Sequence, residues 1–107
     1  MSPKTEEILN ALKKGLLVLY GEKLKDIYLF GSYARGDANP LSSDIDVLII
    51  LEGGFNYWDE LKRSSNLIAD LSLAYDVVIS RKFSSMAEYK NSKMPLYVNI
   101  RAEGIAV

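Results

Sequence analysis

The apolar residues of this chain follow two alternating periods, one typical of helices and one typical of strands. After a Ser-Pro pair at the start, apolar residues recur every three or four positions, which favours a helix with proline in its first turn. We expect this helix to extend from Pro3 to near Gly21 and to bury one stripe of side chains, formed by Ile8, Leu12, Leu16 and Leu19. Short β-branched and aromatic runs then predict strands over residues 26–30 and 45–51.

The second half of the chain continues the same alternation after a Gly-Gly pair. The predicted elements are a helix over residues 57–73, a third strand over 76–80, a helical or turn segment around 84–89, a helix after Pro95 and a last strand from Ile105. The helix over residues 57–73 is expected to bury Leu61, Ile68 and Leu71. The pattern indicates an α/β (α+β) fold, a small mixed β-sheet of about four strands flanked by helices. No repeat, low-complexity tract or linker interrupts the 107 residues, so we expect a single domain over residues 1–107.

Composition narrows the classes of function. The net charge is −1 and the basic residues form no run, so we expect no direct binding to nucleic acid. The absence of cysteine and histidine excludes disulfides, thiolate metal sites and Ser-His catalytic triads. No leader or long apolar span is present, which predicts a cytoplasmic protein that does not associate with membranes.

Two polar clusters lie at the ends of predicted strands. Gly31 and Ser32 follow the first strand, and Asp44 and Asp46 lead into the second. Residues two apart on a strand point the same way, with Cα atoms roughly 6.5 to 7 Å apart, so the two carboxylates can converge on a hard cation. At about 4 Å and an effective dielectric near 20, their repulsion would be on the order of 4 kcal/mol. A bound Mg²⁺ would reverse this repulsion, because it prefers oxygen ligands.

A third carboxylate, Asp76, begins the predicted third strand and would complete a triad if that strand lies beside the other two. Three acids around a nucleoside triphosphate suit two-metal phosphoryl or nucleotidyl transfer. Gly31 would let the backbone approach phosphate oxygens, while the Ser32 hydroxyl and the amides of a short helix opening at Tyr33 would donate to the anion.

Each of these residues also has a purely structural interpretation. The Gly31 turn alone is an ordinary connection from strand to helix, Asp44 suits a loop, and Asp76 could be a surface acid. Arg35 could contact phosphate or form a solvated ion pair with Asp37. The combination favours a functional site, since an Asp-x-Asp entering a buried strand leaves charge that needs a cation.

The motif pair resembles the signature of the minimal nucleotidyltransferase (MNT) branch of the DNA polymerase beta-type nucleotidyltransferase superfamily. That signature is Gly-Ser, a spacer of about ten residues, often with Ala-Arg-Gly inside it, and Asp-x-Asp. The matching residues are Gly31, Ser32, Ala34, Arg35, Gly36, Asp44 and Asp46, and Asp76 falls where the family has its third carboxylate. The resemblance covers the whole chain, and residues 100–107 resemble the family's helix-glycine-strand ending. The spacer is one residue longer than usual, and the turn at Asn39 and Pro40 can hold the extra residue.

The resemblance implies a polymerase-beta-like core that uses ATP as donor and two Mg²⁺ ions. It implies that Asp44 and Asp46 bind both metals, that Asp76 ligates the catalytic one and helps to deprotonate the acceptor, and that these three residues are the catalytic and metal-binding set. It also implies that Gly31 and Ser32 hold the β and γ phosphates, with Arg35 as a further nucleotide-binding residue.

The minimal branch also implies a partner, because larger members carry a second domain for the acceptor. Its members are commonly paired with small helical HEPN-domain proteins in toxin-antitoxin modules. The resemblance therefore predicts an antitoxin that transfers AMP from ATP to a hydroxyl, that of a tyrosine, on a HEPN-type ribonuclease toxin. Two alternatives stay open: a nucleotidyltransferase acting on a small molecule with its acceptor domain in another subunit, and a non-catalytic antitoxin that neutralises by binding. A homo-oligomer and a hetero-oligomer with the partner also both remain open.

Overall fold

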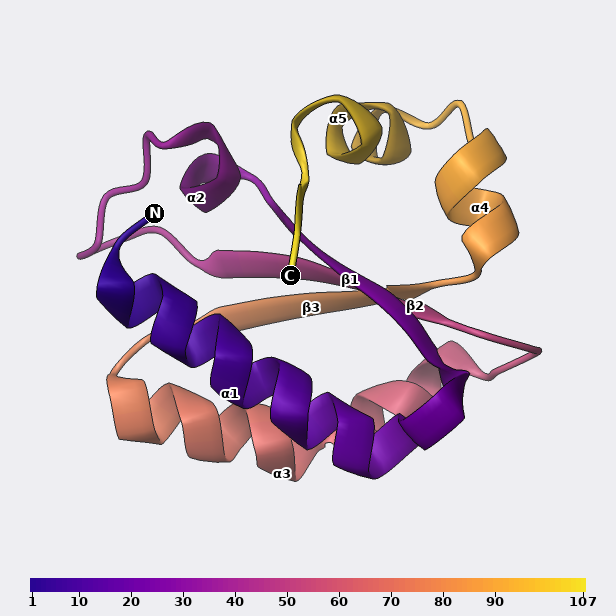
Figure 1. Cartoon of the computed structure of the whole chain (residues 1–107), viewed down its shortest axis with the longest axis horizontal. Coiled ribbons are helices and arrows are strands. Elements are labelled where there is room, and N and C mark those ends of the chain that lie inside the picture. Colours follow the sequence, from indigo (N-terminus) through magenta and orange to yellow (C-terminus); the bar gives the residue numbers. More distant parts are fainter.

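The computed structural model describes residues 1–107 and consists of one sheet between two layers of helices (Figure 1). Its elements are α1 (Pro3–Tyr20), the 3-10 helix η1 (Gly21–Lys23), β1 (Leu24–Phe30), α2 (Ser32–Arg35), β2 (Ile45–Leu51), α3 (Tyr57–Tyr75), β3 (Ile79–Ser84), α4 (Met86–Asn91), α5 (Pro95–Glu103) and β4 (Ile105–Ala106). The strand order is β3-β2-β1-β4, with β2 and β3 parallel and the other pairs antiparallel. The predicted α/β fold with a four-stranded mixed sheet is confirmed.

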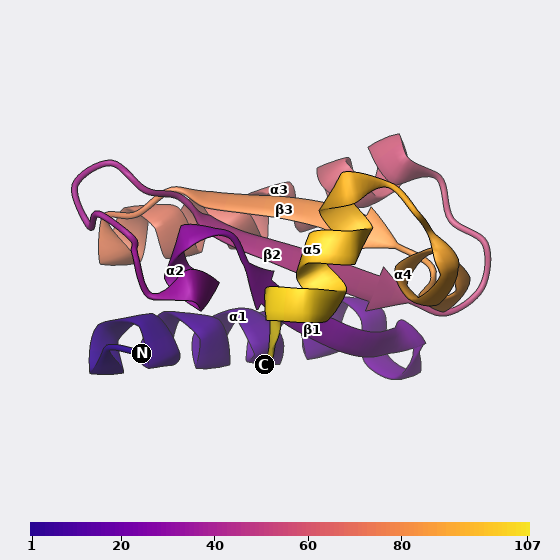
Figure 2. The ribbon, with the colours of Figure 1, turned by 90° about the horizontal axis from the view of Figure 1, so that it is seen from above.

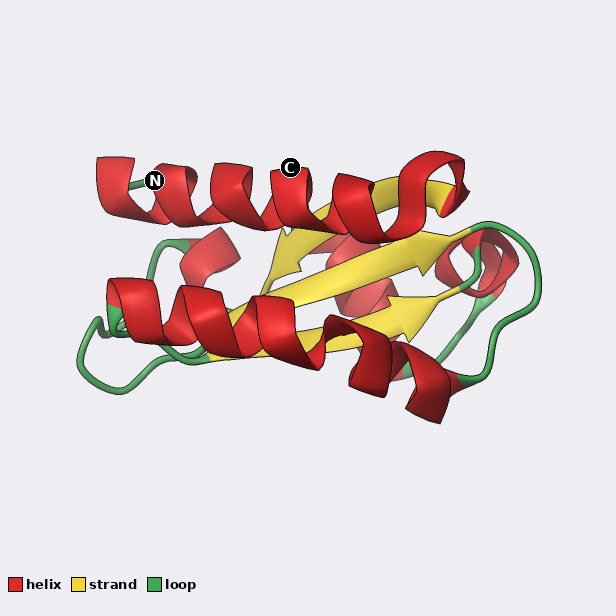
Figure 3. Cartoon of the chain, turned by 90° about the horizontal axis from the view of Figure 1, so that it is seen from below, coloured by secondary structure: helices red, strands yellow, loops and turns green.

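The two long helices lie side by side on one face of the sheet (Figure 3), and the short helices α2, α4 and α5 lie on the opposite face (Figure 2). Strand β2 separates the two layers, because alternate side chains of a strand point to opposite faces. Its residues Ile45, Val47, Ile49 and Leu51 join the core beneath α1 and α3. Leu48 and Ile50 pack on the other face against Tyr97 and Ile100 of α5. Asp46 shares this second face, which therefore carries the site.

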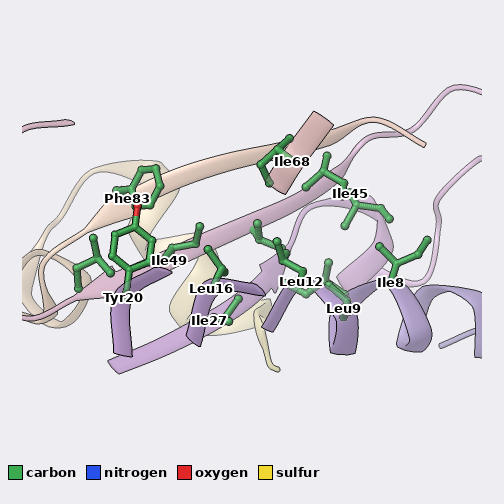
Figure 4. Packing of buried hydrophobic residues seen from close by; sticks show 14 residues of the cluster. Ile8, Leu9, Leu12, Leu16, Tyr20, Ile27, Ile45, Ile49, Ile68 and Phe83 are labelled. Carbon is green, nitrogen blue, oxygen red and sulfur yellow. The ribbon is translucent and has the colours of Figure 1, made fainter. Parts of the chain in front are cut away.

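Helix α1 begins and buries its stripe largely as its sequence predicts. The Ser2 side chain accepts a hydrogen bond from the Thr5 backbone N–H at 3.2 Å and caps the helix ahead of Pro3. Among the four predicted core residues, Ile8, Leu12 and Leu16 are fully buried (Figure 4). The prediction that Leu19 is buried is wrong, since 38% of this residue is exposed and Tyr20 is buried in the core instead. The stripe follows a spacing of four, and residue 20 continues that spacing whereas residue 19 falls outside it.

Tyr20 closes the far end of this core by packing edge-on against Phe83, with ring centroids 6.2 Å apart. On α3, Ile68 is buried as predicted, while Leu61 and Leu71 are only partly buried. Ile105 begins β4 as predicted. None of the helices is long and apolar enough to cross a membrane.

The third strand differs from its prediction over residues 76–80 and lies at Ile79–Ser84. Helix α3 continues to Tyr75, and Asp76 ends it in the left-handed region at φ 52°, a conformation that aspartate tolerates. The strand includes two charged residues, Arg81 and Lys82, which interrupt the apolar pattern that would predict a strand. Arg81 is accommodated because its Nε donates to Ser64 Oγ at 2.6 Å and its Nη2 to the Leu61 carbonyl at 2.7 Å, both on α3.

Candidate active site

The candidate site lies at the end of the sheet where β1 finishes and β2 begins. These strands are antiparallel, and Phe30, the last residue of β1, pairs with Asp46. Gly31 therefore follows directly beside the carboxylate that the sequence assigns to the site. The two polar clusters, separated by the loop after α2, meet because of this pairing.

Gly31 has a backbone that only glycine adopts readily, with φ 74° and ψ −154°. A Cβ placed on it would lie 2.5 Å from Asp46 Oδ2, so the missing side chain leaves room for the carboxylate. The Gly31 carbonyl accepts hydrogen bonds from the N–H groups of Ala34 and Arg35, each at 3.1 Å, and so begins the single turn of α2. The glycine therefore has two effects: it leaves space for the Asp46 carboxylate, and it allows the chain to turn into α2.

Asp46 and Asp44 lie close enough to affect each other's charge. Asp46 is partly buried near the start of β2, while Asp44 is exposed just before the strand. Burial raises the pKa of the Asp46 carboxyl above its ordinary value, and the negative charge of Asp44 raises it further. The positive charges of Lys82 and Arg35 oppose this rise. A cation between the carboxylates would relieve the repulsion that the protein now partly balances with these side chains.

Lys82 is a candidate site residue that the sequence analysis missed. Asp46 pairs with Ser80 in the parallel register of β2 and β3. Because alternate side chains of a strand share a face, Ser80 and Lys82 both lie on the face of the sheet that carries Asp46. The third strand predicted from the sequence ends at residue 80, and Lys82 lies outside it. The register between β2 and β3, once known, would have placed Lys82 beside the carboxylates.

Arg35 makes the contact that its structural interpretation predicted. Its Nε lies 3.3 Å from Asp37 Oδ2, and its Nη1 lies 3.8 Å from Glu103 Oε2 on α5. The arginine side chain is 46% exposed, so these pairs contribute little to stability, on the order of 0 to 1 kcal/mol. Arg35 still acts on the site through its charge, because it lowers the pKa of Asp46. Ser32, the first residue of α2, is partly buried beside Gly31.

Asp76 shares a depression with Asp44 but not with Asp46. The depression, of about 320 Å³, is formed by the loop before β2 and the turn before β3. No three acidic side chains of the structure form a group that could hold a metal ion. The structure therefore brings together Gly31, Asp44 and Asp46, and Asp76 lies at their edge; its role as a metal ligand stays a prediction.

The donor set at the carboxylate pair fits magnesium better than a softer metal. Asp44 and Asp46 offer only oxygen atoms, which Mg²⁺ prefers, and the chain has no histidine or cysteine to favour zinc. Mg²⁺ is typically bound through one or two carboxylates together with substrate phosphates. The oxygen donors of the pair are thus of the kind that Mg²⁺ uses when it is held together with a nucleotide.

A mixed sheet with a glycine turn against a carboxylate pair, open on the face of Asp46, is the arrangement of a nucleotidyltransferase fold. The model of the family described as "Nucleotidyltransferase domain" matches residues 6–104. The chain belongs to this family. It is an enzyme that uses a nucleotide as substrate, and the resemblance stated from its motifs is confirmed.

Three similar proteins agree with this assignment. Two proteins of Methanocaldococcus jannaschii, each named "putative protein adenylyltransferase", are similar to the chain: MJ0604 is 39% identical over 92% of this chain and 89% of its own length. The second, MJ0141, is 38% identical over 69% of this chain and 73% of its own length. A crystal structure of a toxin-antitoxin with AMP-PNP matches with a TM-score of 0.59 and 25% identity, over 91% of this chain and 69% of that chain.

Proposed function

We propose that this protein is an antitoxin that transfers AMP from ATP to a tyrosine hydroxyl of a HEPN-type ribonuclease toxin and so silences it. The observation that carries the proposal is the approach of Gly31 to the Asp46 carboxylate. In the proposal the Gly31 turn accepts phosphate and Asp46 binds metal. The names of the two adenylyltransferase relatives support AMP transfer to protein. The similar toxin-antitoxin structure with an ATP analogue supports the biological setting.

In this proposal three sets of residues would hold the nucleotide: the two carboxylates, the Gly31 turn and Lys82. Asp44 and Asp46 would hold two Mg²⁺ ions, which supply activation of the attacking oxygen and neutralisation of the leaving pyrophosphate when bound. The backbone at Gly31 and the Ser32 hydroxyl would bind the β and γ phosphates. Lys82 adds a positive charge on the same face of the sheet.

The reaction exchanges one phosphoester bond for another. The acceptor oxygen attacks the α-phosphorus of ATP, a bond forms between them, and the bond from the α-phosphorus to the bridging oxygen breaks. Pyrophosphate leaves with the electron pair of that bond. Asp76, at the edge of the site, accepts the proton of the acceptor hydroxyl and later releases it to water. The AMP added to the toxin carries negative charge, which repels the phosphates of an RNA substrate.

The test uses the chain together with the proposed partner, a HEPN-type protein to be sought in the reading frame next to its gene. We expect the two proteins, incubated with ATP and Mg²⁺, to give an intact-mass increase of AMP on the HEPN protein alone. Asp46→Asn should abolish this increase while retaining the fold by circular dichroism. A mass change on a metabolite instead would establish the small-molecule alternative. Neutralisation of the toxin that persists in Asp46→Asn would establish neutralisation by binding.

A further inference from the structure

The depression beside Asp44 has apolar walls as well as acidic ones. We name it the acceptor groove and define it by Leu41, Ser43 and Asp44 on one wall and Asp76 and Val78 on the other. Leu41 is 96% exposed and Val78 is 59% exposed. Two exposed apolar side chains at the mouth of a depression of about 320 Å³ form a surface that a partner could cover.

We propose that the acceptor groove receives the segment of the partner protein that carries the acceptor hydroxyl, and that this segment combines an apolar side chain with a flanking Arg or Lys. The inference rests on the proposed function and adds to it the docking surface and the chemistry of the partner. Position supports the assignment, because Asp44 belongs both to the groove and to the carboxylate pair. A side chain seated there would place its hydroxyl next to the metal-binding acids.

Charge separates the acceptor groove from the nucleotide side of the site. The groove is lined by two carboxylates and by no basic side chain. The cations Arg35 and Lys82 act on Asp46 instead, and neither lines the groove. Triphosphate is therefore favoured beside Asp46, whereas Asp76, which holds no metal in the proposed function, leaves the groove a negative charge that attracts a cationic segment. ATP would then be attracted by Arg35 and Lys82 and the acceptor segment by the groove, so the two substrates would not compete for the same charged residues.

The apolar walls provide affinity that the acids cannot. An exposed leucine and an exposed valine gain free energy when a partner removes them from water. The loop that carries Leu41 is held in place near its base, since the Asn39 N–H donates to Ser43 Oγ at 2.9 Å and the Leu41 N–H to Asn39 Oδ1 at 3.0 Å. A surface held in this way loses little conformational entropy when a partner docks.

The experiment replaces the apolar walls without adding charge. We compare Leu41→Ser and Val78→Ser with Val18→Ser, a control at an 86% exposed valine on α1, outside the groove. The acceptors are the HEPN protein and a synthetic peptide with tyrosine flanked by leucine and arginine. We expect each groove variant to slow AMP transfer to both acceptors about tenfold or more, as expected for loss of a buried aliphatic contact. ATP affinity by calorimetry should be unchanged, and Val18→Ser should match the wild type.

The outcomes separate this inference from the proposed function. If the wild type transfers AMP and the groove variants do so equally fast, the docking inference is overturned and the function stands. If a peptide with glutamate in place of arginine is the better acceptor, the cationic part of the inference is overturned. If the wild type modifies neither acceptor, the proposed function fails and the inference fails with it. Unchanged ATP affinity in the variants shows that they are folded.

Discussion

Gly31 and Asp46 constrain each other, because the carboxylate occupies the space that a side chain at residue 31 would need. The backbone of Gly31 is also in a region that other residues adopt only with strain. These two requirements can be separated, since Gly53 also has a positive φ, 79°, but no neighbour within 4 Å of an added Cβ. The chain thus contains its own matched control for the role of Gly31.

Gly31→Ala should inactivate the enzyme, whereas Gly53→Ala should only destabilise it. Both substitutions force alanine to a positive φ, which costs on the order of 1 to 3 kcal/mol. Only Gly31→Ala also displaces the Asp46 carboxylate. Urea unfolding should therefore show similar losses of stability for both variants, or a larger one for Gly31→Ala, while transfer and ATP affinity fall only for Gly31→Ala. Normal transfer by Gly31→Ala would contradict this role.

The charge of Asp46 should reduce stability at neutral pH when no metal is present. Its folded-state pKa is raised, so the folded protein binds this proton more tightly than the unfolded chain does. The resulting contribution favours folding below the ordinary pKa of 3.8 and is lost as the pH rises through the raised pKa. In EDTA, Asp46→Asn should therefore be more stable than the wild type at pH 7, with little or no such advantage at pH 3.

Urea unfolding at pH 3, 5 and 7 measures this difference. Added Mg²⁺ should then stabilise the wild type and not Asp46→Asn, because the ion binds only the folded carboxylate pair. A variant that is less stable than the wild type at pH 7 in EDTA would show that the charge is already compensated by the protein itself.

At the level of elements, strand β3 places the positive charge of Lys82 at the site, and no local pattern in the sequence indicates this position. Arg81 points to α3 and is bound there by Ser64 and the Leu61 carbonyl, so its neighbours Ser80 and Lys82 point to the face of Asp46. The parallel register with β2 then sets how far along that face each residue lies. Lys82 is therefore positioned by the strand and its anchor on α3 together.

Lys82→Ala should weaken binding of ATP more than it slows the chemical step. Loss of a positive charge beside the phosphates should raise KM for ATP several-fold to about tenfold, equivalent to roughly 1 kcal/mol. Lys25→Ala is the control, because Lys25 pairs with Glu52 at 3.1 Å near the other end of β1. Steady-state kinetics with the HEPN protein measures both parameters. Equal KM values for the two variants would exclude a phosphate contact by Lys82.

At the scale of the whole molecule, the two faces of the sheet are buried to very different extents. The cluster beneath α1 and α3 contains 14 buried residues, whereas the one beneath α4 and α5 contains four. The smaller cluster shares its face with the candidate site. A face that must admit a nucleotide and an acceptor cannot be covered as completely as the opposite one.

Hydrogen exchange should report this asymmetry directly. We expect the amides of α4 and α5 to exchange through local opening, at a lower free energy than those in the middle of α1 and α3, because fewer buried contacts hold the short helices. Native-state hydrogen exchange with mass spectrometry measures both groups in one experiment. Exchange of α4 and α5 only through global unfolding would contradict the prediction.

Local signals in the sequence determined most of the elements and part of the site. The proline after Ser2 and the spacing of Ile8, Leu12 and Leu16 gave the first helix, and the apolar run after Asp46 predicted β2 over its exact residues. The motif around Gly31, with Asp44 and Asp46, identified the candidate site and the family. These features were predictable because helix caps, periodicity and glycine turns depend on residues close together in the chain.

The tertiary structure alone decided how distant segments meet. Strand β3 contains the charged residues Arg81 and Lys82. It forms because it pairs with β2 and because Arg81 finds hydrogen-bond partners in α3, and both β2 and α3 are distant from β3 along the chain. Asp76 does not belong to the strand as predicted, because α3 extends to Tyr75 and Asp76 ends the helix in a left-handed conformation. Which side chains surround Asp46 follows from register and from the order of the strands. Such long-range pairing is set by the packing of the whole chain, so no short window of sequence could specify it.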